Sequence, residues 1–427
     1  AWFEREIARA KLDSAAREKV ASLESGLFQA KQELEALKQS IPGHARLEEN
    51  FSYRKAAEVP ALLRPGALLL SYYFADSALY VFSCTPRQFM GWRRIAVTPG
   101  WRETTDAFAR FLTRLDDESP EKKRWFLKTA AALYDSLLAP ELAGQTDVRS
   151  LVIIPDDQLS YLPFEVLLTA PANNGPWATF PYLVNRYSVA YNYSATLLSV
   201  QQSIEHAAGS KPFFAAFTPV YAGDAVDPVS GYRLDNLKKI QEASAAAARK
   251  FGGDVFVQDA NEDLFKRLAF NYTILVLGMH GFAEMDDPAL SRLIIGNPQP
   301  RQEQDNVLYT AELRLLRLRA RLVVLLACHT GYGQWRKGEG VYSLARAFTM
   351  ASVPATVMSL WSLPDNSASP LMDVFFEKIN HAGAPVDQAL QEAKRAYLNN
   401  PDYFDLSHPF FWAGLMAMGD AGAAITR

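Results

Sequence analysis

Cysteine is scarce in this sequence, which has only Cys84 and Cys328 among its 427 residues. Two cysteines cannot form the disulfide framework of a small secreted domain, and so low a count fits a reducing cytosol. No apolar stretch reaches the roughly 18 residues of a transmembrane helix, and no charged-then-apolar signal peptide opens the chain. The sequence therefore predicts a cytoplasmic protein without a membrane partner.

An excess of basic residues is lacking as well, since the formal net charge is -3. Nucleic acids and anionic membranes are bound mainly through basic surfaces, so neither is expected as a direct partner. Hydrophobic residues make up 49% and charged residues 21%, a composition that argues against disorder. The length exceeds what one hydrophobic core usually supports, so we expect two or three structural units.

The first 40 residues have the apolar pattern of an amphipathic helix that ends at Ser40–Gly43. The apolar positions recur at spacings of three and four: Val20, Leu23, Leu27, Ala30, Leu34 and Leu37. Such a stripe needs a partner, which is either the following domain or a helical region or subunit outside this sequence. The chain opens with Ala-Trp-Phe already in helical register, so we expect a fragment or a processed chain.

From about residue 60 onward, strand and helix patterns follow one another. The pattern predicts a hairpin, then helices, then a regular alternation that is typical of a mostly parallel sheet with helices on both faces. The predicted strands are 67–73, 78–84, 151–155, 213–217, 254–257, 274–277, 322–326 and 355–360, and the predicted helices are 106–115, 121–138, 237–251, one capped by Asn261, and 340–351.

A histidine and a cysteine each come just after a predicted strand. His280 follows the strand 274–277, and Cys328 follows the strand 322–326. In open parallel sheets, functional groups collect beyond the carboxyl ends of the strands, so we expect both side chains at one edge. Gly281 and Gly331 follow them and let the backbone turn sharply. The separation of about 50 residues resembles the histidine-to-cysteine spacing of caspases.

This pair of side chains suits nucleophilic catalysis. A thiol is mostly protonated at neutral pH, and a nearby imidazole can remove its proton and later protonate the leaving amine. The backbone N–H groups of Gly281 and Cys328 are the candidates for binding the developing oxyanion. The alternative is that the cysteine is a small buried hydrophobe, which is the usual role of a single cysteine at a strand end.

Five segments carry a family resemblance. They are 151–156 with 161–165, 279–282, 325–331 with 338–340, 359–361, and 408–415. In order and spacing they resemble the CHAT domain, a caspase-like peptidase module of prokaryotes that often follows tetratricopeptide repeats and is similar to separase. The resemblance covers about residues 60 to 420.

The resemblance implies a caspase-like α/β fold, with a mostly parallel sheet between helices. Residues 48–205 would form an inactive, related half and residues 206–427 the active half, after an N-terminal helical segment at 1–47. It implies a cysteine endopeptidase that cleaves protein substrates through a thioester, with His280 and Cys328 as its dyad and without a metal or organic cofactor. Such modules are switched on by a helical-repeat sensor or a bound complex, often in bacterial defence or regulated cell death. Residues 1–40 would be the end of that sensor.

The substrate pocket is open to two readings. Asp365 matches the place where separase-like sequences have an acidic pocket residue, which would favour a basic residue before the cut. It could instead cap the helix that begins near Ser367. Asp156 is a second pocket candidate, although an Asp pair after a strand is more often a turn. His329 departs from the acidic residue that we expect in most relatives.

Two other functions are compatible with a cysteine at a strand end: a cysteine phosphatase and a catalytically latent scaffold. A cysteine phosphatase would need an arginine six residues after Cys328, and Gln334 stands there, so that class is excluded. A catalytically latent signalling scaffold, which binds partners through the peptidase fold, is the alternative function. Loss of His280 or Cys328 would favour the scaffold, and the sequence keeps both residues.

Overall fold

The computed structural model of the chain describes residues 53–75, 77–115, 119–204, 213–299, 304–327, 331, 333–336 and 340–425, with positions 20, 25–28 and 32. The chain divides into two compact units, residues 1–55 and 56–427. In the first unit, positions 20, 25–28 and 32 are helical, and the rest of the predicted N-terminal helix lies outside the described residues. The second unit includes every candidate site residue.

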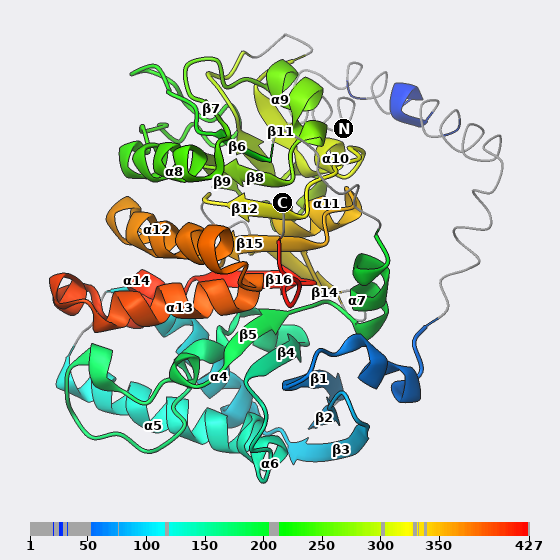
Figure 1. The fold of residues 1–427 in the computed structure, drawn as a ribbon, viewed down its shortest axis with the longest axis vertical. Helices are drawn as coiled ribbons and strands as arrows, with labels where there is room; N and C mark the ends of the chain where they lie inside the picture. Colours follow the sequence, from blue (N-terminus) through cyan, green and yellow to red (C-terminus); the bar gives the residue numbers. More distant parts are fainter. Residues whose placement is uncertain are drawn as a thin grey trace. The chain divides into compact units, whose positions relative to one another are not determined.

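One large sheet runs through the second unit (Figure 1). In the described part of the chain it has eleven strands, whose spatial order differs from their order in the sequence. The order is β3 (Phe89–Ala96), β2 (Ala78–Cys84), β1 (Ala67–Ala75), β4 (Ser150–Ile154), β5 (Ser188–Tyr191), β16 (Leu415–Gly419), β15 (Ala355–Ser359), β12 (Leu322–Leu325), β8 (Ile274–Leu277), β6 (Phe214–Phe217) and β7 (Asp254–Phe256).

Apart from β2 and β3, which pair in antiparallel orientation at one end of the sheet, the strands form two parallel groups that run in opposite directions. β1, β4, β5 and β16 are parallel to one another, and so are β15, β12, β8, β6 and β7. The two groups meet where β15 pairs with β16 in antiparallel orientation. The predicted mostly parallel sheet is therefore confirmed. The carboxyl ends of β8 and β12 lie at one edge of the sheet, whereas β4 ends at the opposite edge.

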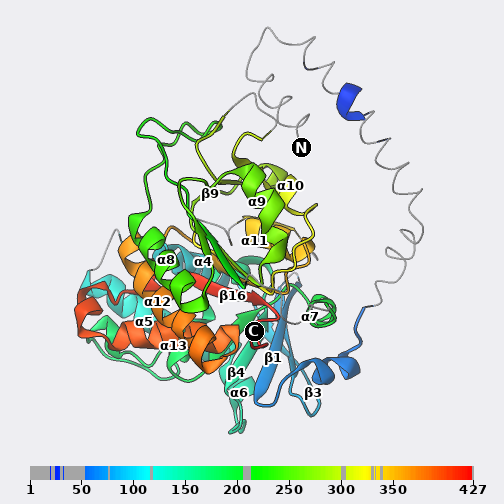
Figure 2. The same cartoon turned by 45° about the horizontal axis from the view of Figure 1, so that its top comes forward.

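Helices cover both faces of the sheet, and β6 shows why. Neighbouring strand residues point to opposite faces, so Phe214 and Phe217 face opposite ways. The Phe214 ring lies 5.1 Å from Phe251 of α8 (Lys238–Phe251) and 5.6 Å from Phe376 of α12 (Asp365–Ala382). The Phe217 ring lies 5.2 Å from Phe265 of α9 (Glu262–Leu268). In Figures 1 and 2, α8, α12 and α13 (Val386–Asn399) lie on one side of the sheet, and α9, α10 (Thr310–Leu313) and α11 (Leu344–Met350) lie on the other.

The predicted helices 121–138 and 237–251 agree with α5 and α8 to within one residue, whereas the predicted helix 106–115 begins too late, since α4 starts at Pro99. Asn261 caps α9, as predicted, because its Oδ1 accepts the Leu264 N–H at 2.8 Å. The described α-helices are α4 (Pro99–Leu112), α5 (Pro120–Leu137), α6 (Ala139–Leu142), α7 (Ala195–Gln202), α8 (Lys238–Phe251), α9 (Glu262–Leu268), α10 (Thr310–Leu313), α11 (Leu344–Met350), α12 (Asp365–Ala382), α13 (Val386–Asn399) and α14 (Pro409–Trp412). Within the residues described, none is long and apolar enough to cross a membrane.

The predicted helix 340–351 is wrong in its first four residues. Gly340–Ser343 forms strand β14, which pairs with β13 (Gly333–Arg336). The helix α11 begins only at Leu344, because Ser343 has extended backbone angles and its hydroxyl accepts the Arg346 N–H at 3.4 Å. A serine in this role marks the start of a helix, so the residues before it are free to pair as a strand.

Within the second unit, a buried ion pair joins a turn that follows β4 to α13 (Val386–Asn399). Glu165 lies in a short 3₁₀ turn (Phe164–Val166), and its carboxylate accepts a hydrogen bond from Lys394 of α13 at 2.7 Å. Both side chains are buried, and Tyr191 of β5 also donates to Glu165. Burial lowers the pKa of Lys394, although Glu165 opposes this shift. The pair therefore depends on Glu165 and Lys394 staying together, since either charge alone would be costly in this environment.

Candidate active site at the carboxyl ends of β8 and β12

The strands β8 and β12 are direct neighbours with a defined register. Leu277 at the end of β8 pairs with Leu325 at the end of β12. His280 lies three residues beyond Leu277, and Cys328 lies three residues beyond Leu325. Cys328, together with His329 and Thr330, lies outside the described residues, so the geometry of the site is that of His280 and its surroundings.

A glycine is required where the chain leaves β8. A Cβ atom on Gly278 would lie 2.6 Å from Ile240 Cγ2 and 2.8 Å from Thr218 Cγ2, both closer than real contacts allow. The backbone passes through this narrow gap and turns into β9 (His280–Phe282). β9 belongs to a second sheet with β10 (Arg292–Ile294) and β11 (Val307–Tyr309). His280 is therefore the first residue of a strand that starts at the edge of the large sheet.

The His280 ring is held by a backbone carbonyl. Its Nε2 lies 2.8 Å from the oxygen of Asp235, and a carbonyl can only accept, so Nε2 carries the hydrogen. In the neutral ring, Nδ1 is then the unprotonated nitrogen. Of the residues that the structure describes, none is hydrogen-bonded to Nδ1. The side chain is 8% exposed, so the ring is largely shielded from water but not sealed off.

Two tyrosines complete the surroundings of His280. The hydroxyl of Tyr221 accepts the His280 N–H at 3.3 Å and donates to the Ile294 carbonyl at 2.7 Å. Burial raises the pKa of Tyr221, which keeps its hydroxyl protonated. The rings of Tyr221 and Tyr232 lie 5.3 Å and 6.0 Å from the imidazole. The loop between β6 and α8 thus contacts His280 through both its ring and its backbone.

No sequence pattern points to the loop between β6 and α8. Asp235 acts through its backbone oxygen, which any residue could supply, so no residue type identifies it. Tyr221 and Tyr232 stand in a Gly- and Asp-rich stretch without a strand or helix period. Only the packing of this loop against β9 reveals its role.

The other predicted site residues are placed as follows. Gly281 lies in β9 and pairs with Leu293 of β10. Asp365 is the first residue of α12, and its two carboxylate oxygens accept the N–H groups of Lys239 and Ile240, each at 2.9 Å. It therefore caps the start of α8, not the helix near Ser367 that the sequence offered as the alternative. Its role in a pocket stays a prediction.

Asp156 also binds backbone amides. Its carboxylate accepts the N–H of Phe74 at 2.8 Å and of Asp157 at 3.0 Å. Asp156 follows β4, which ends at the opposite edge of the sheet from β8 and β12. Its carboxylate thus ties the turn after β4 to β1, and its role in a pocket likewise stays a prediction.

A pocket of about 750 Å³ lies between α4 and the end of β15. Trp361 and Leu360, from one of the motif segments, form part of its wall. Its polar lining comes mostly from α4, with Arg102, Asp106, Arg110 and Arg114, and from the turn after β4, with Asp157, Gln158 and Tyr161. β15 pairs with β12, so this pocket lies at the end of the strand next to the one that leads to Cys328.

Comparison with known proteins identifies the family. The family model of the CHAT domain matches residues 127–420, more than half of the chain. A human protein, tetratricopeptide repeat protein 28, is 24% identical over 349 residues, which cover 70% of this chain and 13% of that protein. This chain thus spans only a small part of its curated relative.

Solved structures with a similar arrangement include a separase and a gingipain. The separase–securin complex of Saccharomyces cerevisiae matches with a TM-score of 0.47 and 9% identity, covering 84% of this chain and 30% of that one. The complex of the pro- and mature domains of Porphyromonas gingivalis RgpB matches with a TM-score of 0.41 and 10% identity, covering 77% and 78%. The family predicted from the motif segments is confirmed by the family model: this chain belongs to the CHAT domain family.

Proposed function

We propose that this protein is a cysteine endopeptidase in which His280 and Cys328 form the catalytic dyad. The proposal depends mainly on the hydrogen bond between His280 Nε2 and the Asp235 carbonyl, which fixes the ring just beyond the carboxyl end of β8. The register between β8 and β12 supports the choice of partner, because it brings two equivalent strand ends side by side. The CHAT domain match supports a peptidase-type fold for this site.

The proposed reaction uses the unprotonated Nδ1 of His280. Nδ1 takes the proton of the Cys328 thiol, and the thiolate attacks the carbonyl carbon of the scissile peptide bond. The N–H groups of Gly281 and Cys328 bind the oxyanion that forms. The carbon–nitrogen bond then breaks, the imidazolium gives its proton to the leaving amine, and a thioester remains. Water, deprotonated by Nδ1, hydrolyses this thioester, which releases the acid and restores the thiol.

The two cysteines of the chain should differ strongly in reactivity. Cys84 lies in β2, is 2% exposed, and burial raises its pKa to about 11. At neutral pH almost none of it is thiolate, so it cannot act as a nucleophile. Cys84 is therefore an internal reference for Cys328.

We also propose how the site is completed and controlled. Asp365 and Asp156 are proposed pocket residues for the side chain before the cut, and residues 48–205 are proposed as the inactive half beside an active half at 206–427. The helical segment at 1–40 would receive the signal of a repeat region or regulatory complex, in bacterial defence or regulated cell death. The match to a tetratricopeptide repeat protein supports a repeat region as the sensor.

The first test is cleavage of a peptide library by the purified chain beside Cys328→Ala and Cys84→Ala. We expect cleavage by the parent and by Cys84→Ala, and none by Cys328→Ala. A preference for Arg or Lys before the cut would support an acidic pocket. Equal cleavage by the parent and Cys328→Ala would refute the dyad.

A second test does not depend on the choice of substrate. Iodoacetamide should alkylate Cys328 much faster than Cys84 at pH 7, and His280→Gln should slow the reaction of Cys328 alone. Peptide mass mapping reads both sites in one sample. Fast alkylation of Cys328 without any peptide cleavage would favour the latent scaffold, in which the site is formed but not used.

A further inference from the structure

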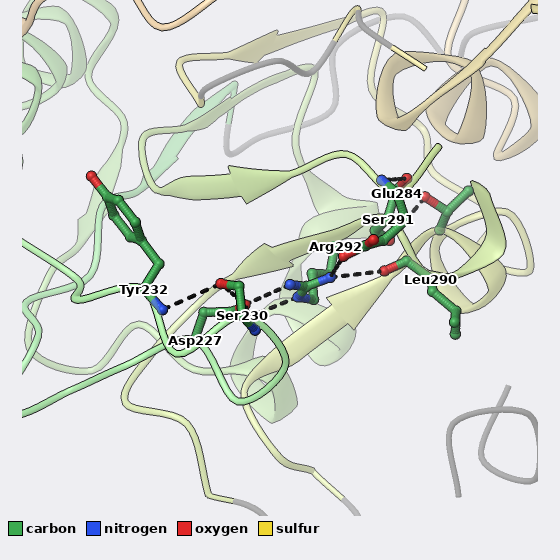
Figure 3. A network of polar contacts seen from close by, with 8 residues as sticks. Asp227, Ser230, Tyr232, Glu284, Leu290, Ser291 and Arg292 are labelled. Carbon is green, nitrogen blue, oxygen red and sulfur yellow. Dashed lines mark hydrogen bonds and ion pairs between the residues drawn. The ribbon is translucent and has the colours of Figure 1, made fainter. Parts of the chain in front are cut away.

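Arg292 of β10 is a fully buried arginine that forms ion pairs with Asp227 and Glu284 (Figure 3). Arg292 of β10 donates from Nε to one carboxylate oxygen of Asp227 at 2.7 Å and from Nη2 to the other at 2.5 Å. Both side chains are 0% exposed. This is a bidentate pair, in which the guanidinium fixes both the position and the plane of the carboxylate.

Arg292 also contacts β9, the strand that begins with His280. It stands opposite Phe282 in the register of β9 and β10, and its guanidinium carbon lies 5.0 Å from the centre of the Phe282 ring. Its Nη1 donates to Glu284 at 2.5 Å and to the carbonyl of Leu290 at 3.4 Å. Burial alone would lower the pKa of Arg292, but the hydrogen bonds to Asp227 and Glu284 outweigh this effect and raise it.

Asp227 in turn organises the loop that reaches His280. Its carboxylate accepts the N–H of Ser230 at 2.7 Å and the Ser230 hydroxyl at 2.5 Å. Its backbone N–H donates to the Tyr232 carbonyl at 2.8 Å and closes a tight turn around Gly231, whose φ of 71° suits glycine. This turn leads directly to Tyr232, beside the His280 ring, and to the Asp235 carbonyl that holds Nε2.

From these contacts we infer that Arg292 is a positioning residue for His280, acting through Asp227. One guanidinium connects β9, which carries the imidazole, with the turn that carries its carbonyl acceptor. Pairing by Arg292 therefore sets the distance between Nε2 and the Asp235 oxygen, and with it the direction of Nδ1. This inference rests on the proposed function, since it assigns Arg292 to the hydrolysis that His280 and Cys328 would perform.

A purely structural role explains the pair less well. Replacing a buried ion pair by apolar residues of similar size is often neutral for stability, so packing alone does not require two charges here. A lysine at position 292 would keep the positive charge but could not form the planar, bidentate contact of a guanidinium. The Arg292→Lys variant therefore distinguishes an effect of charge from an effect of geometry. The pair between Glu165 and Lys394 is equally buried and lies away from the His280 loop, so it serves as a matched control.

The experiment compares three variants of the full chain: Arg292→Lys, Asp227→Leu with Arg292→Met, and Glu165→Leu with Lys394→Met. The two double variants remove both charges, so each stays informative where a single charge deletion would not fold. Two-bond ¹⁵N spectra of histidine-labelled protein report which ring nitrogen of His280 carries the proton, with His280→Gln to assign the signal. Peptide hydrolysis supplies kcat and KM separately.

We expect the parent to show His280 protonated at Nε2, with both tautomers present in Arg292→Lys and in the Asp227–Arg292 double variant. The kcat should fall by tenfold to a hundredfold in these two variants with KM nearly unchanged, since small displacements of a catalytic group have effects of this size. The Glu165–Lys394 variant should match the parent in both measurements.

Two results would overturn the inference. One is an unchanged His280 signal and kcat in folded Arg292→Lys, and the other is an equal change in the Glu165–Lys394 variant. Failure of the proposed function looks different: the parent then hydrolyses no peptide, while the tautomer signal still responds to Arg292→Lys. In that case Arg292 positions His280 for another use of the ring.

Discussion

Two histidines of this chain are buried beside aromatic rings, yet their surroundings give them opposite properties. His280 is 8% exposed, and Nε2 donates to the Asp235 carbonyl. His408 is 2% exposed, and its Nδ1 accepts the Phe410 N–H at 3.1 Å at the start of α14. The Trp177 ring lies 4.5 Å from the His408 ring in an edge-on orientation. Burial first, and the charge of Lys123 second, lower the pKa of His408 to about 4.

The difference lies in the nitrogen that remains for proton exchange. In His408 the lone pair of Nδ1 is used as a helix cap, and protonation would break that bond inside an aromatic cage. In His280 the bond to the protein uses the protonated nitrogen, so the lone pair of the other nitrogen is not needed to hold the ring. Both histidines are buried near aromatic rings, so this burial does not determine whether the ring can accept a proton. The determining property is whether the unprotonated nitrogen is already used in a hydrogen bond.

The largest contrast is expected in catalysis. His280→Gln should lower kcat/KM for peptide hydrolysis by a factor of about 10² to 10⁴, the range for loss of a general acid–base group. His408→Asn keeps an acceptor for the Phe410 N–H and should stay within about threefold of the parent, since His408 takes no part in the proposed chemistry. Comparable losses in the two variants, at equal folded fractions by circular dichroism, would remove the distinction.

The next contrast is in the pH dependence of stability. Well above pH 6.5 His408 is neutral in both states, and as the pH falls toward 4 the unfolded chain takes up a proton that the folded chain excludes. The free energy of unfolding should therefore drop by about 2 kcal/mol between pH 7 and pH 5 because of this one residue. Urea unfolding of the parent minus that of His408→Asn isolates the effect from the carboxylates. A difference that does not change with pH would mean that the folded state accepts the proton.

The smallest contrast concerns Lys123. Its ammonium lies 4.7 Å from the Trp177 ring centre, and its charge is the lesser of the two causes that lower the pKa of His408. Lys123→Met should raise that pKa slightly, so it should reduce the loss of stability only a little between pH 7 and pH 5 and more clearly as the pH approaches 4. The same urea series measures it, with Lys122→Met as the neighbouring control. An increase in the pH-dependent loss would contradict this account.

Much of the fold, but less of the site, could be predicted from the sequence. The strands 274–277 and 322–326 were recognisable because a parallel strand buried on both faces is a continuous apolar run. His280 stood out because a polar residue directly follows such a run. β9, with three residues, is too short to show a period, so the second sheet was missed. The order of β4, β5 and β16 could not be read either, because the direction of a strand within a sheet leaves no local pattern.

The missed parts are those that act through the backbone or over long distances in the chain. The Asp235 carbonyl has no residue signature, and the Asp227–Arg292 pair joins positions 65 residues apart. The match to separase-like sequences predicts a pocket role for Asp365, and the structure adds that its carboxylate accepts two backbone N–H groups at the start of α8, a contact without a sequence pattern. The sequence pattern of a segment predicts which of its side chains are buried. It does not predict which groups its polar atoms will bind.

The position of β16 has a consequence for how the chain is made. β16 lies in the middle of the sheet between β5 and β15, although β5 ends at residue 191 and β16 begins at residue 415. During synthesis, the strand edges of β5 and β15 that pair with β16 stay unpaired until β16 has been made. Contacts so distant in sequence form slowly, and open strand edges attract other chains. Until β16 inserts, the nascent protein therefore exposes two unpaired strand edges at what becomes the centre of the sheet.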